Sequence, residues 1–175
     1  MSDRILVTYA SRAGSTAEVA EAIARTLSEG NAQVDVASMN EVKDISSYQS
    51  VVLGSAIRGS KWLPEAVQFI QKHRSTLAQK KVAMFTVCIT MVMKNAENYR
   101  EGVRGWVAPV RAMVKPVSEG LFAGGLDIGK IPSFSDRLKF RLSVLFGVWK
   151  EGDHRDWNAI RAWAESLRPL LIRNI

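Results

Sequence analysis

Short apolar runs alternate with amphipathic stretches along most of this chain, and the alternation restricts its fold more than any other feature. The stretches repeat apolar residues at helical spacing, as Val19, Ile23 and Leu27 do, and so predict helices. The runs are short and rich in β-prone residues, and so predict strands. The five predicted strands are Ile5–Tyr9, Gln33–Ala37, Val51–Leu53, Lys81–Ile89 and Val117–Ala123.

The connections between these runs are long enough for parallel pairing, because a parallel pair of strands needs a crossover of about a dozen residues or more. Helical stretches are expected to begin at Ser15, Pro64, Asn95 and Asp156. We therefore expect a single α/β domain over residues 1–175, in which helices cover both faces of a five-stranded parallel sheet.

Residues 124–152 do not fit this alternation and are expected to form an insertion between the fifth strand and the last helix. Within it, Ser133–Lys150 predicts an amphipathic helix with basic residues at the borders and back of its apolar face. This composition is typical of a helix that lies in a membrane interface. The alternative is that the face packs against the domain as core. The apolar face is predicted to comprise Phe134, Leu138, Leu142, Leu145 and Trp149.

The charge of the chain is unevenly distributed. Lys and Arg number 24 against 17 Asp and Glu, which gives a net charge of +7. The first 60 residues have five basic and seven acidic side chains, whereas the rest have nineteen and ten. The basic part suits an anionic partner or membrane surface, unless it only keeps the protein soluble. The single cysteine, Cys88, excludes an internal disulfide and a multi-cysteine metal site.

The loop after the first predicted strand gathers small and hydroxyl-bearing residues at the start of a helix. Backbone amides and the dipole at a helix N-terminus favour an anion, so the loop predicts a monophosphate site. It has neither a Walker A motif nor a Gly-x-Gly-x-x-Gly motif, which argues against an NTPase or a dinucleotide site. The alternative is a plain helix cap, because Ser15 and Glu18 have capping-box spacing. The loop consists of Ser11, Arg12, Ala13, Gly14, Ser15 and Thr16.

Residues 9–20, Tyr-Ala-Ser-Arg-Ala-Gly-Ser-Thr-Ala-Glu-Val-Ala, resemble the phosphate loop of flavodoxin-like FMN proteins. The resemblance is closer to one branch of these proteins, the menaquinone-dependent protoporphyrinogen IX dehydrogenases. It covers almost the whole chain, and three further stretches support it. These stretches are Gly54–Arg58, Phe122–Leu126 and Asp156–Trp157.

The resemblance implies a flavodoxin-like three-layer sandwich with strand order 2-1-3-4-5 and with FMN as the cofactor. It implies that Ser11–Thr16 holds the phosphate, that Ser55–Gly59 edges the isoalloxazine ring, and that Thr86–Thr90 contributes to the ring and ribityl chain. No metal ligand or catalytic side chain is assigned, because the cofactor carries the chemistry. The implied cofactor-binding residues are Ser11, Arg12, Ala13, Gly14, Ser15, Thr16, Ser55, Ala56, Ile57, Arg58, Gly59, Thr86, Val87, Cys88, Ile89, Thr90 and Gly124.

The ring-binding positions depart from those of electron-carrier flavodoxins, which usually place the flavin ring between aromatic side chains. Directly after the third and fourth strands this chain has Ile57 and Met91, and Trp62 and Tyr99 follow several residues later. We therefore expect one face of the ring to be open to a flat substrate. Cys88 is expected to be a buried apolar residue, with flavin contact as the alternative.

The resulting hypothesis is an FMN-dependent oxidoreductase that passes electrons from a protoporphyrinogen-like substrate to a quinone at a membrane surface. One alternative is a soluble electron carrier of the flavodoxin type, against which the basic charge argues. No nucleic-acid partner is expected, because no exposed aromatic residues are interleaved with the basic ones.

The sequence also indicates a location. No apolar run approaches the roughly 20 residues of a membrane-spanning helix, and the residues after Met1 lack the pattern of a signal peptide. We expect a cytoplasmic protein, with peripheral contact on the inner face of the membrane through Ser133–Lys150 as a further expectation.

Overall fold

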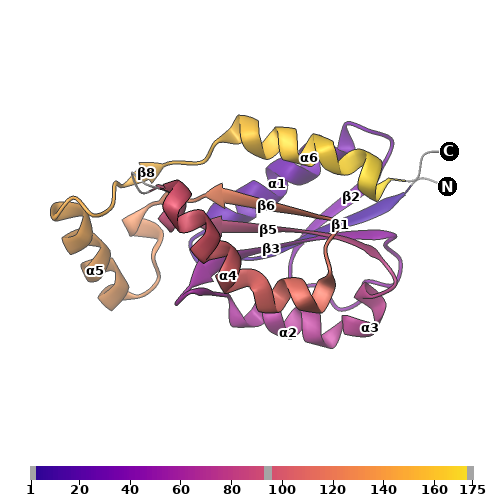
Figure 1. Cartoon of the computed structure of the whole chain (residues 1–175), viewed down its shortest axis with the longest axis horizontal. Coiled ribbons are helices and arrows are strands. Elements are labelled where there is room, and N and C mark those ends of the chain that lie inside the picture. The colour runs from indigo at the N-terminus through magenta and orange to yellow at the C-terminus, as the bar shows by residue number, and fades with distance from the viewer. Residues whose placement is uncertain (1–2, 93–95, 173–175) are drawn as a thin grey trace.

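Five parallel strands form the centre of the structure (Figure 1). The computed structural model, which describes residues 3–92 and 96–172, gives them the order β2-β1-β3-β5-β6. Counted along the chain without the short β4, this is the predicted order 2-1-3-4-5, which is therefore confirmed. The strands are β1 (Arg4–Ala10), β2 (Gln33–Ser38), β3 (Ser50–Arg58), β5 (Lys81–Cys88) and β6 (Ser118–Ala123).

Helices cover both faces of the sheet, as predicted (Figure 1). On one face, α1 and α6 pack together over side chains such as Val7 and Phe85. On the other face, α2, α3 and α4 cover side chains such as Leu6 and Leu53. The expected helix start at Asn95 lies outside the described residues. The helices are α1 (Ser15–Ser28), α2 (Pro64–Lys72), α3 (Arg74–Leu77), α4 (Ala96–Val114) and α6 (Trp157–Leu171), with the 3-10 turns η1 (Ile89–Val92) and η2 (Ile128–Lys130).

The third strand is longer than predicted and continues past the core into a hairpin. Its residues Val51–Leu53 are fully buried, as expected from their unbroken apolar run. The strand then extends to Arg58, after which Gly59 and Ser60 adopt φ angles of 56° and 59° and turn the chain into β4 (Lys61–Trp62). The sequence did not predict this extension, because Gly54 and Ser55 follow Leu53 and these residue types are typical of loops.

The insertion leaves the carboxyl edge of the sheet and returns through a two-stranded antiparallel ribbon of β7 (Gly125–Leu126) and β8 (Gly152–Asp153). Between them lies helix α5 (Phe134–Leu145). Figure 1 shows α5 beyond the ends of the strands, apart from the helices that cover the sheet. The helix predicted to reach Lys150 ends earlier, because the chain turns at Gly147 with a φ of 71°.

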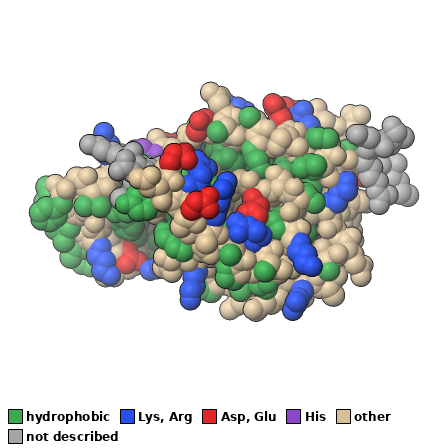
Figure 2. Space-filling view, in the orientation of Figure 1, with side chains coloured by type: hydrophobic (Ala, Val, Ile, Leu, Met, Phe, Trp, Pro, Cys, Tyr) green, Lys and Arg blue, Asp and Glu red, His purple; other side chains and the backbone are tan. Residues whose placement is uncertain are grey.

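The apolar face of α5 does not pack against the domain. None of its 12 residues, all of which the structure describes, is buried. Phe134 and Leu145 are each 78% exposed, and Figure 2 shows hydrophobic side chains gathered over this end of the molecule. The alternative in which this face forms core is therefore wrong. Within residues 3–92 and 96–172, no helix is long and apolar enough to cross a membrane.

A substitution at Gly54 tests how tightly the sheet is packed near its carboxyl edge. A Cβ on Gly54 would lie 2.0 Å from the buried Phe85 ring. We predict that Gly54→Ala lowers the free energy of unfolding by about 1–3 kcal/mol, as overpacking a core does. Urea unfolding followed by circular dichroism measures the change.

Gly102→Ala is the matched control. No other element of the described structure lies within 4 Å of a Cβ on Gly102, which is in α4. This substitution should raise the free energy of unfolding by about 0.5–1 kcal/mol, because alanine favours a helix over glycine. Equal effects of the two substitutions would contradict the packing around Phe85.

Candidate functional site

The loop between β1 and α1 leaves the N-terminus of the helix open. Gly14 is the N-cap and has a φ of 88°, a left-handed conformation that suits glycine. Its amide donates a hydrogen bond to the Ser11 hydroxyl at 3.1 Å. In the described structure nothing lies within 4 Å of a Cβ built on Gly14. The first amides of α1 therefore point into an accessible space, with the helix dipole behind them.

The capping box that Ser15 and Glu18 could have formed is absent from this loop. A capping box needs the Ser15 hydroxyl to accept a hydrogen bond from the Glu18 amide. Instead, Ser15 is already the first residue of α1, and its hydroxyl accepts from the Gly125 amide at 3.0 Å. The Glu18 carboxylate pairs with Arg155 at 2.5 Å. Ser15 therefore ties the start of α1 to the beginning of the insertion, and Glu18 ties it to the chain just after the insertion.

One cleft of about 280 Å³ lies at the carboxyl ends of the strands. It brings together the loop after β1, the carboxyl ends of β3 and β5, which the sequence places at the cofactor, and the chain after β6. These segments meet because parallel strands all end at this edge of the sheet. The predicted residues that line the cleft are Ser11, Arg12, Ala13, Ser15, Thr16, Ala56, Ile57, Arg58, Val87, Ile89 and Gly124.

Six predicted cofactor residues are not on the cleft wall of the described structure, and two of them have structural roles. The buried Ser55 hydroxyl accepts from the Leu63 amide at 3.1 Å and donates to the Ala56 carbonyl. The Thr86 hydroxyl accepts from Trp62 Nε1 at 2.9 Å. These bonds hold the β3–β4 hairpin against the sheet. The other four are Gly14, Gly59, Cys88 and Thr90. Cys88 is buried, as expected. Cofactor contact stays a prediction for all six residues.

The insertion supplies a wall of the cleft through residues that the sequence analysis did not single out. Phe140 of α5 is the aromatic side chain on this wall. Trp62, in contrast, is buried and bonded to Thr86, so it belongs to the core. Helical spacing could have located Phe140, since it lies on the opposite side of α5 from the exposed apolar face. The cleft residues outside the prediction are Leu63, Gly125, Leu126, Ile131, Pro132, Ser133, Asp136 and Phe140.

The charged side chains among the described cleft residues are Arg12, Arg58 and Asp136. Arg12 makes two contacts, at 2.7 and 3.0 Å, with the mostly buried carboxylate of Glu65 on α2. Arg58, at the end of β3, pairs with Asp136 in the first turn of α5 at 2.7 Å. One ion pair therefore joins the hairpin side of the cleft to the insertion side.

Arg155 is a second cation near the first loop, and the sequence analysis did not single it out. Its side chain is only 10% exposed and donates to Asp153 at 2.7 Å and to Glu18 at 2.5 Å. It also lies over the Trp157 ring, 4.5 Å from the centroid. Its hydrogen bonds lower the pKa of Asp153 to about 2, so that carboxylate stays charged in mild acid. No local sequence pattern predicts the pairing of Arg155 with Glu18, because the two residues lie 137 positions apart.

The arrangement suits an elongated ligand with an anionic group at one end. The open N-terminus of α1 and the Thr16 hydroxyl lie at the anionic end, and side chains such as Ile57 and Val87 offer apolar contacts further along. No group of three or more His, Cys, Asp or Glu residues is placed to hold a metal ion in the part of the chain that the structure describes.

Proteins named protoporphyrinogen IX dehydrogenase (quinone) are similar in sequence to this chain over most of its length. A protoporphyrinogen IX dehydrogenase (quinone) of Leishmania major is 27% identical over 179 residues, which cover 97% of this chain and 76% of that protein. The protein of the same name from Escherichia coli K12 is 29% identical over 176 residues, which cover 95% of this chain and 96% of that protein. The resemblance stated from the motifs is therefore confirmed over nearly the whole chain.

Solved flavodoxin structures share the fold. Oxidised flavodoxin 1 from Bacillus cereus gives a TM-score of 0.56 at 20% identity and covers 82% of this chain and 98% of that one. A short-chain flavodoxin associated with a PDU bacterial microcompartment gives 0.60 at 14% identity, over 94% and 96% of the two chains. The sequence profile of the family described as "Flavodoxin domain" matches residues 6–148. The chain belongs to the flavodoxin domain family.

Proposed function

We propose that this chain binds FMN in the cleft and passes electrons from a protoporphyrinogen-like substrate to a quinone. The observation that carries the proposal is that the loop after β1, the carboxyl ends of β3 and β5 and the insertion line one cleft. The fold supports flavin binding, and the similarity to quinone-dependent protoporphyrinogen dehydrogenases over 95% of the chain supports an oxidoreductase role. The cofactor and the organic substrate would share this cleft.

The residues of the first loop fit the phosphate of FMN. Thr16 is only 1% exposed and yet lines the cleft, so its hydroxyl is available to a group bound there. The open space at Gly14 leaves room for the phosphate in front of the amides of α1. Because Glu65 already pairs with Arg12, we expect these neutral donors to contribute more than the Arg12 charge.

The flavin ring would lie between the hairpin and the loop after β5, with Ala56, Ile57 and Val87 as apolar contacts. When bound, the flavin supplies the redox chemistry, and the protein supplies position and electrostatics. Side chains of this chain would orient the substrate against the ring and exclude water, with Phe140 and Leu126 as walls on the side of the insertion. Phe140 is the one aromatic side chain among the described cleft residues, so a face of the ring would be open to a flat substrate.

The exposed apolar face of α5 is the surface that we propose for peripheral membrane contact. Basic residues flank it within Ser133–Lys150, and helices of this composition bind with their apolar side chains among the lipid headgroups and upper acyl chains. Quinones with isoprenoid tails dissolve in the bilayer, so contact through α5 would bring the cleft close to its electron acceptor. We therefore propose a cytoplasmic protein held at the inner face of the membrane.

The direct test is oxidation of protoporphyrinogen IX by the FMN-loaded protein with a menaquinone as acceptor. Porphyrin fluorescence should rise at a rate that depends on both protein and quinone. Anaerobic reactions without quinone are the control, because oxygen oxidises protoporphyrinogen without an enzyme. If a flavodoxin reductase reduces the bound flavin and protoporphyrinogen does not, the chain is an electron carrier and the proposal fails.

Thr16→Val removes the hydroxyl proposed to bind the phosphate and keeps the volume of the side chain. We predict that the dissociation constant for FMN rises about tenfold, because a hydrogen bond to a charged group contributes about 1.5–3 kcal/mol. Titration of FMN followed by flavin fluorescence measures the change. Thr26→Val, at a second buried threonine of α1, is the matched control and should bind FMN like the wild type. Equal weakening by both would indicate loss of the helix rather than of a phosphate contact.

Replacing both Phe134 and Leu145 with Ser removes two exposed apolar side chains from α5. Burial of each side chain contributes about 1.5–3 kcal/mol, so partitioning onto anionic liposomes should fall by about a hundredfold or more. Liposome flotation measures the bound fraction. Leu170→Ser changes an exposed leucine of α6 and should leave partitioning unchanged. Undiminished binding of the double variant would rule out α5 as the membrane contact.

A further inference from the structure

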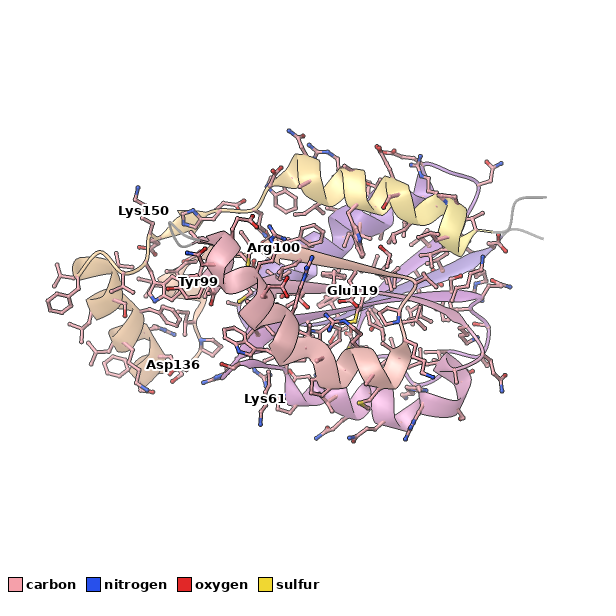
Figure 3. All side chains as sticks on the ribbon, in the orientation of Figure 1. Lys61, Tyr99, Arg100, Glu119, Asp136 and Lys150 are labelled. Atoms are coloured by element: carbon pink, nitrogen blue, oxygen red, sulfur yellow. The ribbon has the colours of Figure 1, made fainter. Side chains whose placement is uncertain are left out.

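We propose that Arg58 binds a carboxylate of the substrate and that Asp136 occupies this binding position in the free protein. The inference rests on the function proposed above and assigns a specificity-determining residue to its cleft. Arg58 and Asp136 pair at 2.7 Å, and both line the cleft. Figure 3 shows Asp136 at the end of α5 on the side of the β3–β4 hairpin, where Lys61 is labelled.

The backbone around Arg58 is held firmly while its guanidinium remains accessible. Arg58 ends β3 opposite Lys61 of β4, and the hydrogen bond from Trp62 to Thr86 anchors this hairpin to the sheet. The Arg58 side chain itself is 60% exposed. A carboxylate that enters the cleft can therefore reach a cation whose backbone does not have to move.

Asp136 can release Arg58 without becoming an unpaired buried charge. It lies in the first turn of α5, where the helix dipole favours a carboxylate. Lys139 Nζ lies 4.0 Å from the carboxylate oxygen of Asp136 that Arg58 does not contact. The Asp136 side chain is also partly exposed to water. Exchange of one carboxylate for another on Arg58 also conserves the charge-assisted hydrogen bond. After the exchange, Arg58 pairs with the carboxylate of the substrate and Asp136 remains close to Lys139.

Arg12, the other cation among the described cleft residues, is less suited to this role. It makes two contacts with Glu65, whose carboxylate is mostly buried. Withdrawing Arg12 would leave that carboxylate buried without compensation, which is costly. Arg58 makes one contact with a more accessible partner, so Arg58 is the cation that can change partner.

The surroundings of Arg58 define the class of ligand. Ile57 and Leu63 on one side and Pro132 and Phe140 on the other give the cleft apolar walls. These walls with a cation at the rim suit a flat apolar molecule that has a carboxylate at its edge. A tetrapyrrole with propionate side chains has this chemistry, since its ring is apolar and its charges lie on the periphery.

Equilibrium binding of protoporphyrin IX and of its dimethyl ester to the FMN-loaded protein tests the assignment, because the ester has the same ring without the negative charges. Arg58→Gln should raise the dissociation constant of the diacid about tenfold and that of the ester less than about twofold. Arg58→Lys should fall between wild type and Arg58→Gln, because lysine keeps the charge without the planar fork. Asp136→Asn should lower the dissociation constant of the diacid about threefold, because the competing carboxylate is gone.

A merely structural ion pair predicts a different pattern. Arg58→Gln and Asp136→Asn would then both loosen the insertion and weaken the diacid and the ester by similar factors, and that result would overturn the assignment. Arg104→Gln is the matched control, because it breaks an exposed pair with Glu101 on α4, away from the cleft. It should change the affinity for neither porphyrin.

The outcomes also separate this inference from the proposed function. If the wild type oxidises protoporphyrinogen but binds diacid and ester equally, and Arg58→Gln has no effect, Arg58 is rejected and the function stands. If the wild type binds neither porphyrin and does not oxidise protoporphyrinogen, both proposals fail. Thermal melting followed by circular dichroism shows whether each variant is folded.

Discussion

The common direction of the five long strands determines where every part of the site lies. Because β1, β3, β5 and β6 end at the same edge, loops that are distant in the chain meet there. Ser15 and Gly125 lie 110 positions apart and are joined by a hydrogen bond. The strand order adds a second constraint, since β2 and β3 lie on opposite sides of β1. Ligands of open parallel sheets bind at such a point, where the order reverses, and the N-terminus of α1 opens there.

The insertion contributes both a wall of the cleft and an exposed apolar surface. One side of α5 presents Phe140 and Asp136 to the cleft, and the opposite side exposes an apolar face that nothing in the described structure covers. Large exposed apolar patches are uncommon on monomeric proteins and mark interaction surfaces. The two ends of the insertion pair with each other in the β7–β8 ribbon, and shortly after it Arg155 pairs with Glu18. A single helix therefore forms a wall of the cleft with one side and, on the other, exposes the apolar face for which we propose membrane contact.

Local patterns in the sequence predicted most of the fold and part of the site. The unbroken apolar run of Val51–Leu53 located a buried central strand, and the Ser11–Thr16 loop located the open helix N-terminus. The same patterns could not show that the Ser55 and Thr86 hydroxyls are used inside the hairpin, because their partners are fixed only by tertiary packing. The pairing of Arg58 with Asp136, 78 positions apart, is hidden for the same reason. Sequence periodicity predicts which face of a helix or strand a residue lies on, but it does not predict which side chain the residue contacts.

Binding of FMN is the central claim, and a titration of the purified protein with FMN, followed by its absorbance spectrum, tests it most directly. A saturable change in the flavin bands, with one FMN bound per chain, is the predicted result. A shift of that titration to about tenfold higher FMN concentration in the Thr16→Val variant would locate the phosphate at α1. A spectrum identical to that of free FMN at every concentration would contradict the claim and leave only the flavodoxin fold.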